Sequence, residues 1–190
     1  MKRKMVLWML LLLLPTMTGC VPVVVGTGAV AGYGAATDER TAGTLLDDKT
    51  LAAQIKTKLI SYSDIAARRI NVDVIEGTVY LIGLTDSAEK KQAITKIVSD
   101  IKGVKDVDNL LVVGKRTIGE YTRDKANESN AKGAMAGTPH IRSLNVYVTS
   151  VKGVIFLVGK IRSEEERRLV HQAVRDAVPD AQIVDRTRLS

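Results

Sequence analysis

The same pattern of hydrophobic and polar residues occurs twice along this chain. The run Gly77–Gly83 (GTVYLIG) matches Gly153–Gly159 (GVIFLVG) at an offset of 76 residues. A repeated pattern of this length indicates two copies of one supersecondary unit. We therefore expect two small domains, one over residues 47–114 and one over residues 115–190.

The first copy predicts a helix, a β-hairpin, a second helix and a last strand. Apolar residues at helical spacing follow Asp48, which we expect to cap the first helix. Alternating residues over 70–75 and 78–84 predict the hairpin, and residues 107–113 predict the last strand. Asp86 is the expected cap of the second helix. The apolar stripe of that helix comprises Ile94, Ile97, Val98 and Ile101.

The second copy repeats the later elements but has a weaker first helix. Its hairpin is expected over 144–149 and 154–161, Ser163 caps the following helix, and Ile183 begins the last strand. At the offset of 76, the expected cap Asp48 becomes Asp124, and the apolar residues of the first helix become Asn127, Ala131 and Met135, with Gly133 among them. Each lost apolar side chain removes roughly 1.5–3 kcal/mol of burial. This helix is therefore either frayed or free to face something other than its own core.

The chain begins with the three parts of a secretory signal peptide. Basic residues at positions 2–4 precede an apolar run over 5–14 and small residues before Cys20. The run is too short to cross a bilayer, which needs a helix of about 20 residues. We expect residues 1–19 to be removed, which places the only cysteine of the chain at the new amino terminus.

Residues 20–46 are expected to form a flexible tether after Cys20. The stretch 23–36 consists of small and apolar residues and contains four glycines. Within it, residues 26–31 (GTGAVA) fit a dinucleotide-binding turn, but that motif works only between a strand and a helix. Because Gly32 and Gly34 would interrupt the helix, we do not expect nucleotide binding.

Both copies resemble the BON domain, which is found in bacterial envelope proteins. The first copy carries an I-N-V-x-V strand over 70–74, a G-x-V-x-L-x-G strand over 77–83 and the closing stretch VKDVDNL over 104–110. Residues 36–48 also resemble the linker of outer-membrane lipoproteins that carry two such domains. The resemblance implies an α+β fold without enzymatic activity. Each α-β-β-α-β domain would pack its helices on one face of a three-stranded sheet.

The segment Met17–Cys20 (MTGC) resembles a bacterial lipobox, with Met in place of the preferred Leu. The resemblance implies acylation of Cys20 by palmitate-like chains, and two or more such chains form a stable membrane anchor. Val21 follows the cysteine where retention at the inner membrane would need Asp. By the sorting rule of enteric lipoproteins, this implies an outer-membrane protein that faces the periplasm.

Positive charge is concentrated in the second copy. The chain has 28 Lys and Arg residues against 21 Asp and Glu residues, a net charge of +7. Three of these charges lie in the leader, residues 47–113 carry ten of each sign, and residues 114–190 carry fourteen basic and nine acidic groups. Basic side chains near an anionic bilayer contribute about 1 kcal/mol each. The second domain is therefore the one expected to meet a membrane.

We expect the weak first helix of the second copy to lie against anionic phospholipid of the phosphatidylglycerol kind. The candidate side chains are Arg116, Ile118, Tyr121, Arg123, Lys125 and Lys132. Ordinary solvated Lys and Arg side chains are the alternative explanation. The same positive charges could bind nucleic acid, but a secreted, lipid-anchored protein does not encounter nucleic acid in its normal function.

The sequence offers no set of residues for catalysis, a metal or a cofactor. Cys20 is expected to be acylated, and the two histidines, His140 and His171, are expected to be solvated. Three glutamates at 164–166 are explained as favourable charges at the start of a helix. We therefore expect no enzymatic activity, no metal and no cofactor.

These observations predict a non-enzymatic outer-membrane lipoprotein. It would bind anionic phospholipid through its second BON domain and support outer-membrane integrity. The alternative is a lipid-anchored module that docks on outer-membrane assembly proteins, in which case all membrane affinity comes from Cys20.

Overall fold

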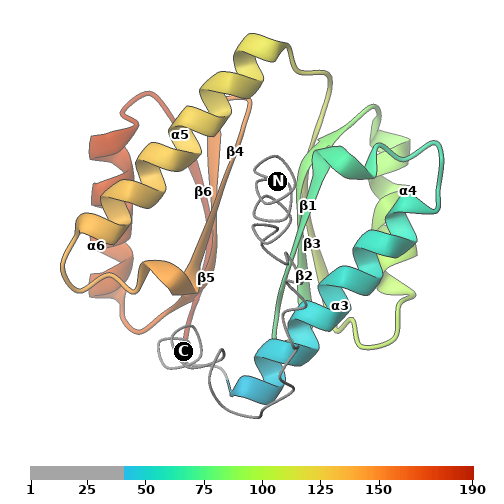
Figure 1. Cartoon of the computed structure of the whole chain (residues 1–190), viewed down its shortest axis with the longest axis horizontal. Helices are drawn as coiled ribbons and strands as arrows, with labels where there is room; N and C mark the ends of the chain where they lie inside the picture. Colours follow the sequence, from blue (N-terminus) through green and yellow to red (C-terminus); the bar gives the residue numbers. More distant parts are fainter. Residues whose placement is uncertain (1–40) are drawn as a thin grey trace, which may run out of the picture. The chain divides into compact units, whose positions relative to one another are not determined.

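A computed structural model describes residues 41–190 of the chain, without the side chain of Ala42. The expected signal peptide, Cys20 and the tether up to residue 40 lie outside the described residues. The described residues belong to one compact unit, in which one order of elements occurs twice (Figure 1).

Each half of the described chain has the predicted order α-β-β-α-β, with one short 3₁₀ turn before its first strand. The first domain consists of α3 (Ala42–Ile60), η1 (Ala67–Arg69), β1 (Ile70–Ile75), β2 (Thr78–Thr85), α4 (Ala88–Ser99) and β3 (Asp106–Val113). The second consists of α5 (Ile118–Gly137), η2 (Ser143–Asn145), β4 (Val146–Val151), β5 (Val154–Ile161), α6 (Glu164–Ala177) and β6 (Gln182–Leu189). The α+β prediction is confirmed.

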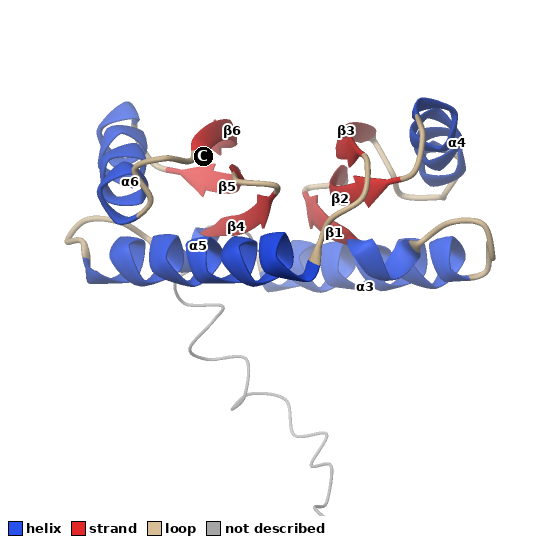
Figure 2. Cartoon of the chain, turned by 90° about the horizontal axis from the view of Figure 1, so that it is seen from above, coloured by secondary structure: helices blue, strands red, loops and turns tan. Residues whose placement is uncertain are grey.

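The two sheets have the same topology and the same register. In the first, β2 lies in the middle, antiparallel to β1 and parallel to β3; in the second, β5 takes the middle place between β4 and β6. Ile70 pairs with Gly83, and at the offset of 76 Val146 pairs with Gly159. Both helices of a domain lie on the same face of its sheet, as predicted (Figure 1, Figure 2).

The helix-covered face of each sheet buries one hydrophobic cluster. In the first domain α3 contributes three side chains that are almost fully buried, Leu51, Ile55 and Leu59. In the second domain α5 contributes only two buried side chains, Ala131 and Met135, and most of the cluster comes from the sheet and α6. The weaker apolar face that the sequence predicts for α5 is therefore real, and the other elements of the domain compensate for it.

The uncovered faces of the two sheets share a third cluster. Its buried members come from both domains: Ile75, Tyr80, Ile82, Leu84, Val151, Phe156 and Val158. Polar contacts join the same surfaces. Lys160 Nζ lies 2.8 Å from Glu76 Oε1, and Arg186 Nε lies 2.9 Å from Asp108 Oδ2. The domains therefore stabilise one another through an apolar interface edged with ion pairs.

The three clusters do not depend on the amino-terminal segment. All of their residues lie between Leu51 and Val184. A chain that begins at Val21 therefore keeps both cores and the interface, and is expected to fold by itself.

Two predicted helix caps are wrong. The side chain of Thr41, not Asp48, caps α3 by accepting from Thr44 N at 3.2 Å. The helix thus begins at Ala42, within the last residues of the expected tether over 20–46. Ser87, one residue after Asp86, caps α4. The prediction that Ser163 caps α6 is confirmed.

The glycine that closes each G-x-V-x-L-x-G strand allows a close approach of two backbones. Gly83 has a φ of +151°, and a Cβ atom there would collide with the carbonyl oxygen of Arg69. At the equivalent Gly159, a Cβ atom would collide with the carbonyl oxygen of Asn145. The motif therefore requires glycine because the 3₁₀ turn before the first strand lies directly against it.

Candidate functional site

The helix that carries most of the predicted binding residues, α5, begins earlier than expected and is not frayed. Thr117 and Glu120 form a capping box: Thr117 Oγ1 accepts from Glu120 N at 3.2 Å, and Glu120 Oε2 accepts from Thr117 N at 2.7 Å. The helix therefore starts at Ile118, six residues before Asp124. The T-x-x-E spacing is present in the sequence and would have located this start.

A buried carboxylate fixes α5 on the hairpin of the second domain. Asp124 accepts from Lys152 N and Gly153 N, both at 2.9 Å, in the tight turn between β4 and β5. Both turn residues have positive φ, as a type I′ turn requires. Asp124 also accepts from Ser150 Oγ and from Arg116 Nη1, at 3.2 and 2.8 Å. Burial opposes the charge of Asp124, but these hydrogen bonds hold its pKa below the ordinary value.

The structure gives Arg116 a positioning role. Its guanidinium bonds to Asp124, its side chain is only 17% exposed, and it lies over the ring of Tyr121 at 4.6 Å from the centroid. Ile118 is 86% exposed and Tyr121 is 48% exposed. An exposed apolar pair therefore lies beside a fixed cation at the start of α5.

The predicted residues do not share one face of α5. Tyr121, Lys125 and Lys132 follow one another at spacings of four and seven residues, so they lie on one flank. Glu128 lies between the two lysines and pairs with both, at 3.1 and 2.7 Å. Arg123 precedes Lys132 by nine residues, or two and a half turns, so its side chain projects from the opposite side of the helix.

The flank with the two lysines faces the first domain. Asp73 of β1 lies near Glu128 and Lys132. Burial raises the pKa of Asp73 to about 6, with Glu128 adding to the rise and Lys132 opposing it. The pKa of a carboxylate at the place where the domains meet is therefore well above its ordinary value.

Two adjoining cavities lie where the start of α5 meets the first domain. Their volumes are about 210 and about 120 Å³, and both are lined by Arg69, Leu84, Arg116 and Tyr121. Ile118 lines the larger cavity, and the smaller one adds Arg68, Asn71, Lys125, Thr149 and Ser150, among others. No acidic residue lines either cavity in the described part of the chain. We call this place the junction cavity.

Sequence reasoning missed the contribution of the first domain to the junction cavity. Arg68 and Arg69 belong to η1, directly before β1, and are far from α5 in the sequence. A pair of arginines that immediately precedes a buried strand is a visible signal. Only the packing of the two sheets, however, brings that pair to Arg116.

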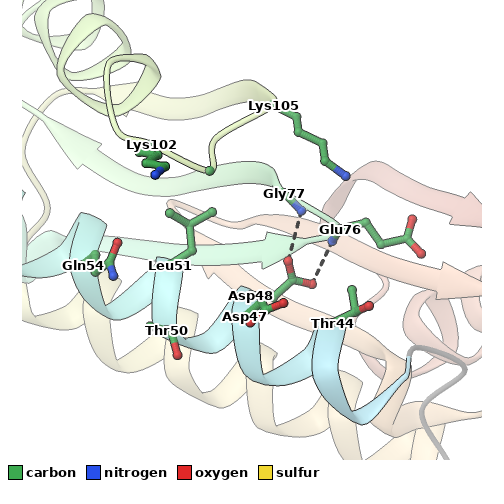
Figure 3. A pocket seen from close by; sticks show the side chains of 11 residues that line it. Thr44, Asp47, Asp48, Thr50, Leu51, Gln54, Glu76, Gly77, Lys102 and Lys105 are labelled. Carbon is green, nitrogen blue, oxygen red and sulfur yellow. Dashed lines mark hydrogen bonds between the residues drawn. The ribbon is translucent and has the colours of Figure 1, made fainter.

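A larger groove, of about 500 Å³, lies in the first domain (Figure 3). Lys102 and Lys105 face α3 across it, and Leu51 lies between them and the helix. The carboxylate of Asp48 accepts from Glu76 N and Gly77 N, at 2.8 and 3.0 Å. It therefore fastens the hairpin turn, as Asp124 does in the second domain, and has a structural role.

The expectation of a solvated His171 is wrong. Its Nε2 lies 2.6 Å from Asp185 Oδ2, and its side chain is 26% exposed. Asp185 Oδ1 accepts from the hydroxyl and the amide of Thr187, at 2.7 and 2.6 Å. Thr187 is buried and bonds to the aspartate, so it is not placed as a nucleophile activated by the histidine. The pair fastens α6 to β6.

Residues 41–190 contain neither a cluster of metal-ligating side chains nor a membrane-spanning helix. No group of three or more His, Cys, Asp and Glu side chains in this range could hold a metal ion. No helix in this range is long and apolar enough to cross a bilayer.

Comparison with known proteins supports the repeat. The family model described as "BON domain" matches residues 47–115 and 123–189. The outer membrane lipoprotein DolP of Haemophilus influenzae is 32% identical over 149 residues, which cover 77% of each chain. The osmotically-inducible protein Y of Escherichia coli is 26% identical over 127 residues, or 65% of this chain and 63% of that protein.

A similar solved structure comes from another kind of protein. The C-terminal domain of CdsD, a structural protein of the type III secretion system of Chlamydia trachomatis, aligns with 73% of this chain and 64% of that chain. The alignment has a TM-score of 0.30 and 14% identity.

Proposed function

Because this chain belongs to the BON-domain family and carries two copies of that domain, we propose that it is a non-enzymatic outer-membrane lipoprotein. Acylated Cys20 anchors it, and both domains face the periplasm. The second BON domain binds anionic phospholipid of the phosphatidylglycerol kind and thereby supports outer-membrane integrity. The similarity to a protein named as an outer membrane lipoprotein supports the location.

One observation carries the lipid-binding part of the proposal. The exposed side chains of Ile118 and Tyr121 lie among cations at the start of α5. Apolar and aromatic side chains enter the interfacial layer of a bilayer, and neighbouring cations attract anionic headgroups. This combination suits a membrane surface better than solvent alone, because 86% of the Ile118 side chain is otherwise left in water.

Vesicle flotation of residues 21–190 tests the lipid-binding proposal without the anchor. We expect the chain to float with phosphatidylglycerol vesicles and not with phosphatidylcholine vesicles. Binding should weaken with salt, because the attraction is screened beyond a Debye length of roughly 8–10 Å. Equal failure to float with both kinds of vesicle would contradict it and favour the alternative, a module that docks on outer-membrane assembly proteins.

Charge-reversal variants assign the binding to a domain. Arg123 and Lys125 project from different sides of α5. The double variant Arg123→Glu and Lys125→Glu therefore reverses the charge on both sides of the helix and should abolish flotation. The matched control carries Lys102→Glu and Lys105→Glu in the groove of Figure 3, with the same change in net charge. A control that also fails to float would overturn the assignment to the second domain.

The anchor has a separate test. Radiolabelled palmitate should be incorporated into the full chain and not into the Cys20→Ala variant. Label retained in that variant would refute acylation at Cys20.

A further inference from the structure

The junction cavity is cationic although the repeated fold does not require this. At the offset of 76, Arg68 and Arg69 correspond to Leu144 and Asn145 in η2. Both turns are 3₁₀ helices of three residues and lead into equivalent strands. The second copy thus builds the same turn with a leucine that is 68% exposed. The turn itself therefore does not require the two arginines of the first copy.

Carboxylates outside the cavity lining hold three of its four cations. Arg69 Nη2 lies 2.5 Å from Asp86, and Arg116 Nη1 lies 2.8 Å from Asp124. Lys125 Nζ lies 3.1 Å from the carboxylate of Glu128. These contacts fix the positions of the charged groups in advance. Fixed donors bind an anion better than flexible ones, because less side-chain entropy is lost.

Several donors remain available after these pairs have formed. A guanidinium carries five N–H groups in a planar fork, so one carboxylate leaves others unused. The Nε of Arg69 is buried and has no hydrogen-bond partner among the described residues. Arg68 is exposed at the cavity and makes no ion pair within the described range. The amide nitrogen of Asn71, which also lines the cavity, donates one hydrogen to Thr149 Oγ1 and keeps a second.

The size and the chemistry of the cavity both favour a small anion. Volumes of about 210 and about 120 Å³ are below the roughly 300–1,000 Å³ of drug-sized ligand sites. Paired guanidinium groups match the tetrahedral oxygens of a phosphate group. The exposed ring of Tyr121 and the side chain of Ile118 extend from the same place, where they could meet the apolar part of a lipid.

We infer that the junction cavity binds a phosphate group, with Arg68 and Arg69 of the first domain acting together with Arg116 and Lys125 of the second. The phosphate could belong to a lipid headgroup or to a free ion. The inference deepens the proposed function, since the phosphatidylglycerol headgroup would be held by both domains and not by α5 alone.

A single exposed residue of the first domain provides the test. In residues 21–190, Arg68→Ser removes one cation outside α5 and should weaken flotation with phosphatidylglycerol vesicles about fivefold. The control, Arg175→Ser, removes an exposed cation of α6 and should change flotation less than twofold. Equal thermal unfolding midpoints would show that both variants fold.

Titration with inorganic phosphate separates the two sources of the ligand. In amide NMR spectra of residues 21–190, saturable shifts should appear at Arg68, Asn71, Arg116 and Lys125, and they should vanish in Arg68→Ser. If phosphate gives these shifts but phosphatidylglycerol vesicles do not bind, the cavity takes free phosphate and the proposed lipid binding fails.

Two other results would overturn the inference. If Arg68→Ser floats like the unmodified chain and phosphate shifts lie elsewhere, the junction cavity is not the site, although lipid binding by α5 stands. If neither vesicles nor phosphate bind, the inference and the proposed lipid binding both fail.

Discussion

Replacing Asp73 with Asn should stabilise the protein at neutral pH. Burial raises the pKa of this carboxyl group from 3.8 to about 6. The folded state therefore binds its proton more tightly than the unfolded state does, and the free energy of unfolding falls as pH rises between these two values. At about 1.4 kcal/mol per pH unit, the penalty at pH 7 is about 3 kcal/mol. Asparagine has a similar shape and carries no charge, so it removes the penalty.

Urea unfolding of residues 21–190 between pH 3.5 and 7.5 measures the effect. The unmodified chain and Asp73→Asn should be about equally stable near pH 3.5, where the aspartate is protonated in the folded state and mostly protonated in the unfolded state. Their difference should grow up to about pH 6 and level off near 3 kcal/mol. This figure already contains the attraction between Asp73 and Lys132, which opposes the rise in the pKa of Asp73.

The shape of this difference curve decides the matter. Two curves that run parallel from pH 3.5 to 7.5 would refute the reasoning, because a constant offset cannot come from a titration in this window. Asp180→Asn, at an exposed aspartate after α6, is the matched control for the same chemical change at the surface.

Three further substitutions test the packing. Gly159→Ala places a Cβ atom against a backbone carbonyl and should lower the free energy of unfolding by about 3 kcal/mol, measured by urea unfolding; an effect below 1 kcal/mol would contradict the close approach. Gly133→Ala, in an open part of α5, should instead raise it by about 1 kcal/mol, because alanine favours helix; a destabilised variant would contradict this. Phe156→Ala removes a side chain that is 4% exposed in the cluster between the sheets and should cost about 3–5 kcal/mol. A smaller loss would show that the interface is not well packed.

The local features of the fold could be predicted because they depend on neighbouring residues. Alternation over 70–75 and 78–84 predicts a hairpin, and the structure has strands over Ile70–Ile75 and Thr78–Thr85. The cap at Asp48 was predicted wrongly because its partners, Glu76 and Gly77, lie in the hairpin and not in the next turn of the helix. Helix-cap preferences consider only the local chain, so they cannot recognise a carboxylate that bonds across the domain.

The candidate site was only half visible in the sequence for the same reason. The basic residues from Arg116 to Lys132 are close together along the chain, so the positive charge of this segment is visible in the sequence. Arg68 and Arg69 belong to a domain with balanced charge, where two arginines do not stand out. They reach the junction cavity only because the two sheets pack through their uncovered faces, and this arrangement depends on contacts distant in sequence.

Asp124 couples folding of the second domain to the geometry of the junction cavity. In the first domain Asp48 fastens the equivalent turn, and in the second domain Asp124 fastens the turn and also holds Arg116. Arg116 lies in the segment that joins the two domains, so one carboxylate fixes the hairpin, the helix and a cation of the cavity. A substitution at Asp124 would alter stability and phosphate binding together and could not separate them. A substitution at Arg68 can separate the effect on phosphate binding from the effect on stability. Arg68 is exposed and makes no ion pair with another residue that the structure describes.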